Sequence, residues 1–174
     1  MIEIRWHARA GQGAKTAAYL LAKAALRSGK SAQAFPEYGP ERRGAPVQAY
    51  TRIDDRPIRR HDSVTAPRAV AVLDSSLLGE PTVVEGAGPG TILLADVDGP
   101  PSLNGMRVVP VPAAQLAGKA GTKHVNLVMA GAVAAALRQP PLENVEEAAV
   151  ELLGAKADAA AIRAAVREGY EWLS

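Results

Sequence analysis

IEIRWHARAGQGAKT, residues 2–16, predicts a short strand, a glycine turn and the first turn of a helix. Ile2, Ile4 and Trp6 alternate with polar residues, which is the two-residue period of a strand. After Gly13 the apolar residues recur at the spacing of one helix face. The chain is therefore expected to begin as an α/β fold does, with a strand, a tight turn and a helix.

The two glycines of this turn, Gly11 and Gly13, leave main-chain N–H groups uncovered at the expected helix N-terminus. The helix dipole adds positive potential there, so the position suits an anion such as a phosphate. Two phosphate motifs do not match, however. The P-loop needs glycines where Arg9 and Ala14 stand, and the dinucleotide fingerprint needs its third glycine where Thr16 stands. The spacing leaves two interpretations open, a ligand site and a plain strand-to-helix turn.

The composition is that of a globular protein with a single domain, residues 1–174. Hydrophobic residues make up 48%, and cysteine is absent, which excludes disulfides, thiol catalysis and iron–sulfur ligation by this chain. The three histidines are scattered and indicate no metal site, while a net charge of +2 and 4% aromatic residues do not favour nucleic-acid binding. We find no signal-peptide pattern and no apolar run near the ~20 residues of a membrane span, and we expect a cytoplasmic protein.

The order of the expected elements indicates an α/β fold, with a mostly parallel, Rossmann-like sheet flanked by helices and with C-terminal helices. A helix over residues 13–27 leads to a strand at 31–35, which predicts a parallel layer with a right-handed crossover. The wholly apolar run 69–73 is typical of a central strand covered on both faces. Further strands are expected at 47–53, 82–84, 91–95 and 107–111, a loop at 96–106, and helices from 126 to the prolines at 140–141, at 142–153 and at 158–172.

Residues 36–46, PEYGPERRGAP, are expected to form a loop because they contain three prolines and two glycines. This loop leaves the carboxyl end of the second expected strand, the edge at which parallel sheets bind ligands. Arg42 and Arg43 suit an anionic ligand, since guanidinium groups donate paired hydrogen bonds to phosphate or carboxylate. Beside the glycine turn, we favour a ligand or interface role over a plain solvated loop.

A basic stretch follows the loop. We expect most of its side chains to face solvent. The alternative is that they form a docking patch for an acidic partner. Its members are Arg52, Arg56, Arg59, Arg60, His61 and Arg68. Asp74 comes directly after the apolar strand at 69–73. We expect it to cap the next helix, with a ligand contact as the alternative.

Five motifs occur in order along the chain: GQG at 11–13, AFPEYGPERRGAPV at 34–47, IDDRPI at 53–58, VLD at 72–74 and VNLVMAGA at 125–132. Together they resemble the gamma subunit of pyruvate (2-oxoacid):ferredoxin oxidoreductases. The resemblance covers nearly the whole chain, and the long second motif is specific. Ala8 and Ala10 stand where members of this family usually carry glycine, whereas Gly11 and Gly13 are kept.

The resemblance implies a multi-subunit enzyme that oxidatively decarboxylates a 2-oxoacid with coenzyme A to an acyl-CoA and passes the electrons to ferredoxin. Thiamine diphosphate, magnesium and iron–sulfur clusters would belong to the sister chains, the alpha, beta and delta subunits or their fused equivalents. The chain alone is then expected to be catalytically inert. The sister chains would largely select the 2-oxoacid, although the ERRGAP form at 41–46 resembles pyruvate-type members more than those for 2-oxoglutarate.

On this resemblance we predict that the chain helps to form a coenzyme A site and a subunit interface, without a catalytic residue or a metal ligand of its own. The cofactor-binding residues are predicted to be Gly11, Gln12, Gly13, Arg42, Arg43 and Asn126. Coenzyme A carries a diphosphate and a ribose phosphate, which suit glycine amides and arginines. Two alternatives stay open: Asn126 caps its own helix, and Gln12 bonds to the loop instead of the ligand.

Two other functions remain open from the residues. One is a free-standing dinucleotide-binding oxidoreductase of Rossmann type, for which Glu37 is the nearest acidic candidate to hold a ribose hydroxyl. The other is a structural module whose glycine turn binds nothing and whose loop serves only as an interface.

Overall fold

The computed structural model describes residues 1–37, 44–99, 102–103, 106–155 and 157–174. The strands are β1 (Ile2–Arg9), β2 (Ser31–Glu37), β3 (Pro46–Asp54), β4 (Ala69–Val72), β5 (Ile92–Asp96), β6 (Ser102–Leu103) and β7 (Met106–Val111). The helices are α1 (Ala14–Arg27), α2 (Pro81–Val84), α3 (Ala113–Lys119), α4 (Val125–Leu137), α5 (Leu142–Leu153) and α6 (Ala159–Trp172). A short 3-10 helix, η1 (Ser75–Leu77), follows β4.

The strands lie in one sheet in the order β2-β3-β1-β4-β5-β7-β6. The pairs β1–β4, β4–β5 and β5–β7 are parallel, and the predicted α/β class with a mostly parallel sheet is confirmed. β3, however, lies between β1 and β2 and is antiparallel to both. β1 and β2 therefore run in the same direction without pairing, so the layer expected for residues 2–35 contains an inserted strand. The carboxyl ends of β1 and β2 still reach the same edge of the sheet.

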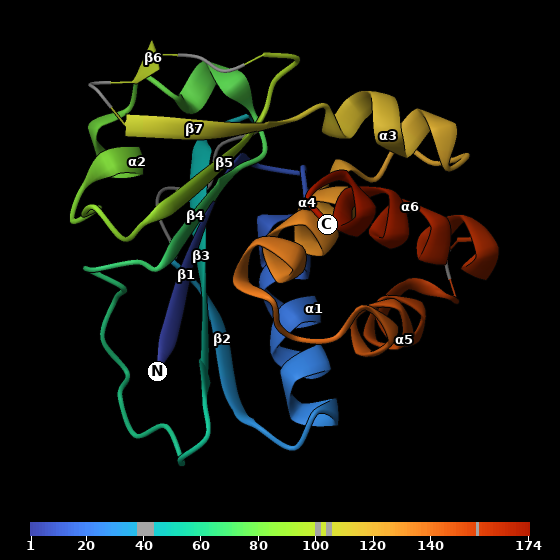
Figure 1. Cartoon of the computed structure of the whole chain (residues 1–174), viewed down its shortest axis with the longest axis horizontal. Helices are drawn as coiled ribbons and strands as arrows, with labels where there is room; N and C mark the ends of the chain where they lie inside the picture. The colour runs from blue at the N-terminus through green and yellow to red at the C-terminus, as the bar shows by residue number, and fades with distance from the viewer. Residues whose placement is uncertain (38–43, 100–101, 104–105, 156) are drawn as a thin grey trace.

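Helices α1, α4, α5 and α6 lie on one side of the sheet (Figure 1). Helix α4 contacts β4, β5, α1 and α6, and its residues 126–134 are all buried. Two glycines allow α4 and α6 to cross closely. A methyl group on Gly131 would lie 2.0 Å from the carbonyl oxygen of Val166, and one on Gly169 would lie 1.9 Å from that of Val128. The main chains of the two helices are therefore in direct contact.

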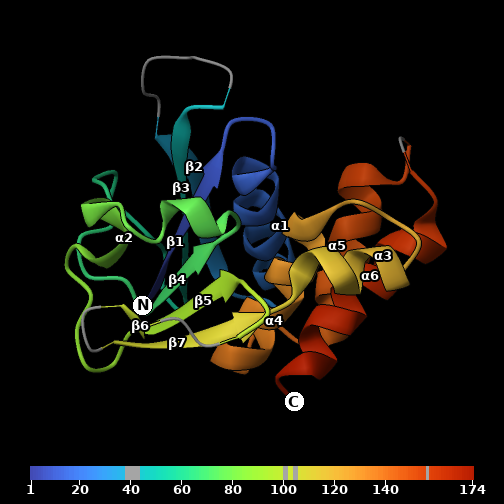
Figure 2. The same ribbon diagram turned by 90° about the horizontal axis from the view of Figure 1, so that it is seen from above.

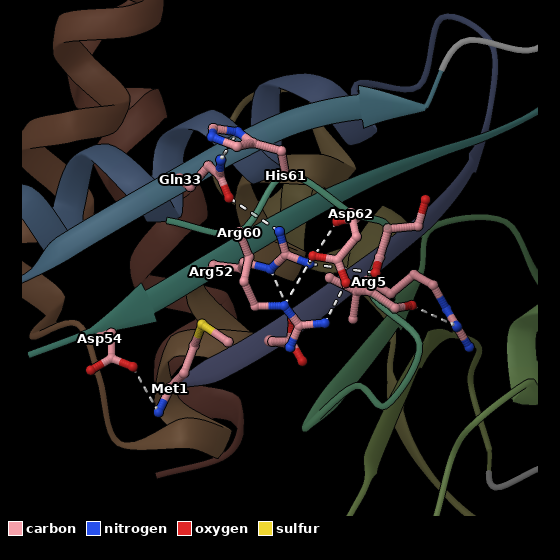
Figure 3. Close-up of polar contacts among 11 residues, drawn as sticks. Met1, Arg5, Gln33, Arg52, Asp54, Arg60, His61 and Asp62 are labelled. Carbon is pink, nitrogen blue, oxygen red and sulfur yellow. Dashed lines mark hydrogen bonds and ion pairs between the residues drawn. The ribbon is translucent and has the colours of Figure 1, made fainter. Parts of the chain in front are cut away.

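The other side of β1 and β3 carries polar side chains beneath irregular chain. Arg52 on β3 is fully buried, and its guanidinium donates to the Glu3 carboxylate at 2.8 Å and to the Asp62 carbonyl at 2.6 Å (Figure 3). It also donates to the side-chain oxygen of Gln33 at 3.2 Å. Most of the basic stretch faces solvent, as expected, and Arg52 is the exception because these bonds hold residues 62–63 over its side chain. The other five members are exposed, as expected.

A second buried arginine, Arg5 on β1, also donates hydrogen bonds to main-chain carbonyl oxygens. Its guanidinium donates to the carbonyl oxygens of Val83 at 3.1 Å and Glu85 at 2.7 Å, and more weakly to that of Val64 at 3.4 Å. Its Nε donates to Nε2 of His7 at 3.1 Å. Arg5 thus holds the segment around α2 and the coil before β4 against the sheet.

Several local expectations are wrong or incomplete. Residues 82–84, expected as a strand, belong to α2. Its valines favour a strand through β-branching. Pro81, however, fixes a φ suited to the first helical turn, and Val83 packs into an apolar cluster with Val70 and Val72. Helix α3 was not expected, and β6 lies within the predicted loop at 96–106.

Elements with strong local signals are confirmed. They are α1, α4, α5, α6, β4, β5 and β7, together with β3. Asp158 caps α6, accepting a hydrogen bond from the Ala160 N–H at 3.0 Å. In the described part of the chain, every helix is too short or too polar to pass through a bilayer.

Candidate functional site

The glycine turn lies where the carboxyl ends of β1 and β2 meet the N-terminus of α1, on one side of the molecule (Figure 2). Gly11 and Gly13 have φ angles of +98° and +91°, in a region that residues with a Cβ atom rarely adopt. Gly13 is the N-cap of α1, and no described side chain bonds to the first-turn amides as a cap. Those amides are consequently available at the positive end of the helix dipole.

Asn126 packs against this turn from α4. Its side chain is almost fully buried, and its Nδ2 atom lies 3.5 Å from the Gly13 carbonyl oxygen. A methyl group on Gly13 would lie 2.6 Å from that Nδ2 atom. The N-cap of α4 is His124, so Asn126 lies inside the helix and does not cap it. The fold thus brings together two predicted site residues that are more than a hundred positions apart.

Gln12 is held within the protein at both ends of its amide. Its Oε1 atom accepts a hydrogen bond from the Arg9 N–H at 2.7 Å, and its Nε2 atom donates to the Asp74 carboxylate at 2.7 Å. These bonds match the alternative in which Gln12 bonds to its own protein. They also fix the shape of the turn between Gly11 and Gly13.

Arg42 and Arg43, predicted to bind the same ligand, lie outside the described residues. Their described neighbours on the carboxyl side, Gly44 and Ala45, bond directly to the region of the turn. The Ala10 N–H donates to the Ala45 carbonyl at 2.9 Å, and Nη1 of Arg9 donates to the Gly44 carbonyl at 3.1 Å. Gly44 and Ala45, which directly follow the two arginines in the sequence, therefore lie beside the glycine turn.

Sequence reasoning missed Arg9 and Ser76 at this edge. Nε and Nη2 of Arg9 donate to Oγ of Ser76 at 3.0 and 2.8 Å. Asp74 caps η1 as expected, accepting from the Ser76 N–H at 3.0 Å. Hydrogen bonds from Ser76 and Gln12 lower the pKa of Asp74, and the Arg9 charge adds to this effect. An arginine next to the glycine motif was the only sequence signal, and nothing in the sequence linked it to residue 76.

The polar face beside the site contains two groups whose pKa is strongly shifted. Burial, followed by the charge of Arg5, lowers the pKa of His7 to about 3, so its imidazole is neutral at pH 7. Burial, followed by a hydrogen bond to Glu37, raises the pKa of Tyr50 to about 12. The Tyr50 hydroxyl donates to the Glu37 carboxylate. Glu37, the candidate ribose partner of the dinucleotide alternative, is thus engaged with Tyr50, and β3 separates its strand from β1.

The described residues contain no group of three or more histidine, cysteine, aspartate or glutamate side chains placed to hold a metal ion.

The family model of pyruvate ferredoxin/flavodoxin oxidoreductase matches residues 3–172. The chain belongs to this family. It is 42% identical over 180 residues to pyruvate synthase subunit PorC of Thermotoga maritima, covering 97% of this chain and 93% of that protein. It is 45% identical over 159 residues to the common subunit gamma of the pyruvate/ketoisovalerate oxidoreductases of Thermococcus kodakarensis, covering 87% and 86% of the two chains.

Solved structures agree with this membership. The crystal structure of the Thermotoga maritima subunit has a TM-score of 0.82 at 36% identity, covering 98% of this chain and 95% of that one. The fold also recurs in a 2-oxoglutarate:ferredoxin oxidoreductase of Magnetococcus marinus, with a TM-score of 0.73 at 18% identity, covering 98% of this chain and 30% of that one. This family member is thus a gamma subunit of an oxidoreductase complex. The comparisons give no support to a free-standing dinucleotide-binding enzyme.

Proposed function

We propose that this gamma subunit supplies part of the coenzyme A site in a complex that oxidises pyruvate or a related 2-oxoacid. The N-terminus of α1 beside Gly11 and Gly13, which no side chain among the described residues caps, carries this proposal. Coenzyme A is a polyanion, and first-turn amides bind phosphate oxygens through both hydrogen bonds and the helix dipole. Asn126, packed against the turn, adds an amide from a second helix.

The charges around the turn support an anionic ligand. The first turn of α1 contains no acidic residue and instead carries the exposed Lys15, although a negative side chain would stabilise the helix dipole there. The Asp74 carboxylate, which bonds to the turn, accepts hydrogen bonds from Gln12 and Ser76 and lies beside the charge of Arg9. Arg42 and Arg43 would add two further cations on the adjoining segment.

The catalytic chemistry is assigned to other subunits in this proposal. A chain without cysteine cannot ligate an iron–sulfur cluster through thiolates, so the clusters, together with thiamine diphosphate and magnesium, would reside in the alpha, beta and delta subunits or their fused equivalents. Ferredoxin would accept the electrons from the complex. The role of this chain is then to bind and orient coenzyme A and to form a subunit interface.

Kinetics of the assembled oxidoreductase test this role. Replacing both Arg42 and Arg43 with alanine is expected to raise the KM for coenzyme A at least about tenfold, because each charge-assisted hydrogen bond contributes ~1.5–3 kcal/mol. Asn126→Ala should raise it less, since it removes a neutral donor. The KM for the 2-oxoacid should stay unchanged in both variants.

The matched control replaces Arg56 and Arg59, two exposed arginines in the coil before β4, with alanine. This pair should leave both KM values unchanged. If the coenzyme A KM is also unchanged in the Arg42/Arg43 and Asn126 variants while the complex still co-purifies, only the interface role remains.

A further inference from the structure

Three segments of chain converge on Arg9, the last residue of β1, two of them on its side chain and one on its main-chain N–H. They are the glycine turn, the start of β3 at Gly44–Pro46, and the residues after β4 at Asp74–Ser76. We call Arg9, Gln12, Asp74 and Ser76 the Arg9 network. Its members come from separate parts of the sequence but meet at the edge where β1 and β4 end.

The guanidinium of Arg9 bridges two of these segments. Nη1 donates to the Gly44 carbonyl at 3.1 Å, while Nε and Nη2 both donate to Oγ of Ser76. The Nε atom also lies 3.8 Å from the Asp74 carboxylate. Such an arrangement requires a planar group with donors on opposite sides, which arginine has and lysine lacks.

Asp74 links the same bridge to the glycine turn. One carboxylate oxygen accepts from Nε2 of Gln12 at 2.7 Å, and the other accepts from Oγ of Ser76 at 2.5 Å. The Gln12 side chain in turn accepts from the main chain of Arg9. The hydrogen bonds thus form a closed circuit around the turn, and its geometry depends on each member.

We infer that Arg9 is a positioning residue for coenzyme A. By fixing Gly44 and Ser76 relative to the glycine turn, the Arg9 network sets the position of the α1 amides that meet a ligand. This inference rests on the proposed function, because it concerns the same site. Within the described residues, Arg9 donates its side-chain hydrogen bonds to protein oxygens, so it acts on a ligand through the segments that it holds.

Steady-state kinetics of the assembled oxidoreductase test the inference with three variants. Arg9→Met is expected to raise the KM for coenzyme A about tenfold, with kcat and the KM for the 2-oxoacid unchanged, because small displacements of binding groups weaken ligand contacts steeply. Ser76→Ala should raise the same KM although the Arg9 charge is kept. The KM for coenzyme A of Arg9→Lys should lie between the values of the wild type and of Arg9→Met. Lysine can replace one of the hydrogen bonds but cannot bridge Gly44 and Ser76.

The Ser76→Ala variant separates positioning from a direct contact. If Arg9 bound the phosphates itself, Ser76→Ala would leave the coenzyme A KM unchanged, and that result overturns the inference. A fall in kcat together with a rise in both KM values would indicate a general structural role and would overturn it too. Arg68→Met, which changes an exposed arginine before β4 at the opposite edge of the sheet, is the matched control and should leave all three constants unchanged.

Asn126→Ala distinguishes this inference from the proposed function. If Asn126→Ala raises the coenzyme A KM while Arg9→Met and Ser76→Ala do not, the positioning role alone is wrong. If all three variants leave that KM unchanged and the Arg42/Arg43 variant does so too, the proposed coenzyme A site is wrong as well.

Discussion

The two faces of the sheet are covered in different ways. On one face, α4 and α6 cross so closely that Gly131 and Gly169 each face the main chain of the other helix. On the other face, Arg5 and Arg52 hold the last turn of α2 and irregular chain by donating to their carbonyl oxygens. Helices satisfy their own main-chain hydrogen bonds, so they can pack through small residues alone. Irregular chain cannot, and its buried carbonyls need donors from side chains.

Gly131→Ala is expected to give the largest loss of stability, on the helical face. The added methyl group would lie 2.0 Å from the Val166 carbonyl oxygen, so the two helices must move apart. Overpacking of this kind should cost about 3 kcal/mol or more of unfolding free energy, measured by denaturant titration of the subunit.

The matched control is Gly118→Ala in α3, where no atom lies within 4 Å of the added group. It should be neutral or stabilising by up to about 1 kcal/mol, because alanine favours a helix over glycine. Equal losses for the two variants would mean that the close crossing does not determine the effect.

Arg52→Met should give the next largest loss, on the polar face. The variant keeps the apolar volume but leaves the Glu3 carboxylate and the carbonyls of residues 62–63 without their buried donor. A loss of about 2 kcal/mol of unfolding free energy is expected. The exposed Arg60, which also pairs with Asp62, provides the control: Arg60→Met should have no measurable effect. A similar loss of unfolding free energy in both variants would show that the burial of Arg52 does not explain its larger effect.

The last predicted effect, and the smallest over a single pH unit, is a pH dependence set by His7. Its pKa is about 3 in the folded protein and close to 6.5 when unfolded, so between these values the unfolded state binds more protons. Stability is therefore full above pH 6.5 and falls as the pH drops below it, by at most about 1.4 kcal/mol per pH unit for this proton. Unfolding curves at pH 7, 6 and 5 should show this loss.

His7→Gln should flatten that dependence because glutamine can accept from Arg5 without titrating. His61→Gln, at an exposed position in the basic stretch, serves as the control and should keep the wild-type slope. An unchanged slope in His7→Gln would show that the buried imidazole does not cause the loss of stability.

The predictions from sequence succeeded where the signal is local. The alternation in residues 2–7 and the change of period after Gly13 are confirmed as β1 and α1. Asp158 and the prolines at 140–141 mark helix boundaries because capping and proline geometry act within a single turn. Val83 and Val84, by contrast, pack against valines of β4 as part of a helix and do not form the strand that their propensity favours.

The candidate site was predicted only in part, because only some of its residues have a local signal in the sequence. Gly11 and Gly13 are identified by spacing alone, since a positive φ in a short turn is a local requirement. Asn126 was assigned to the same ligand through the family resemblance, but its contact with Gly13 was not predicted. The Arg9 network was missed because it joins three distant segments, and no periodicity relates Arg9 to Ser76.

The sequence by itself determined the glycine turn, the parallel core strand at 69–72, the C-terminal helices and the family motifs, all of which depend on short-range geometry or on a run of residues. Only the tertiary structure decided that β3 enters between β1 and β2, that Arg52 is buried, and that Arg9 reaches both Gly44 and Ser76. The physical reason is that strand pairing and buried hydrogen bonds join residues far apart in the chain, whose partners are set by packing of the whole molecule.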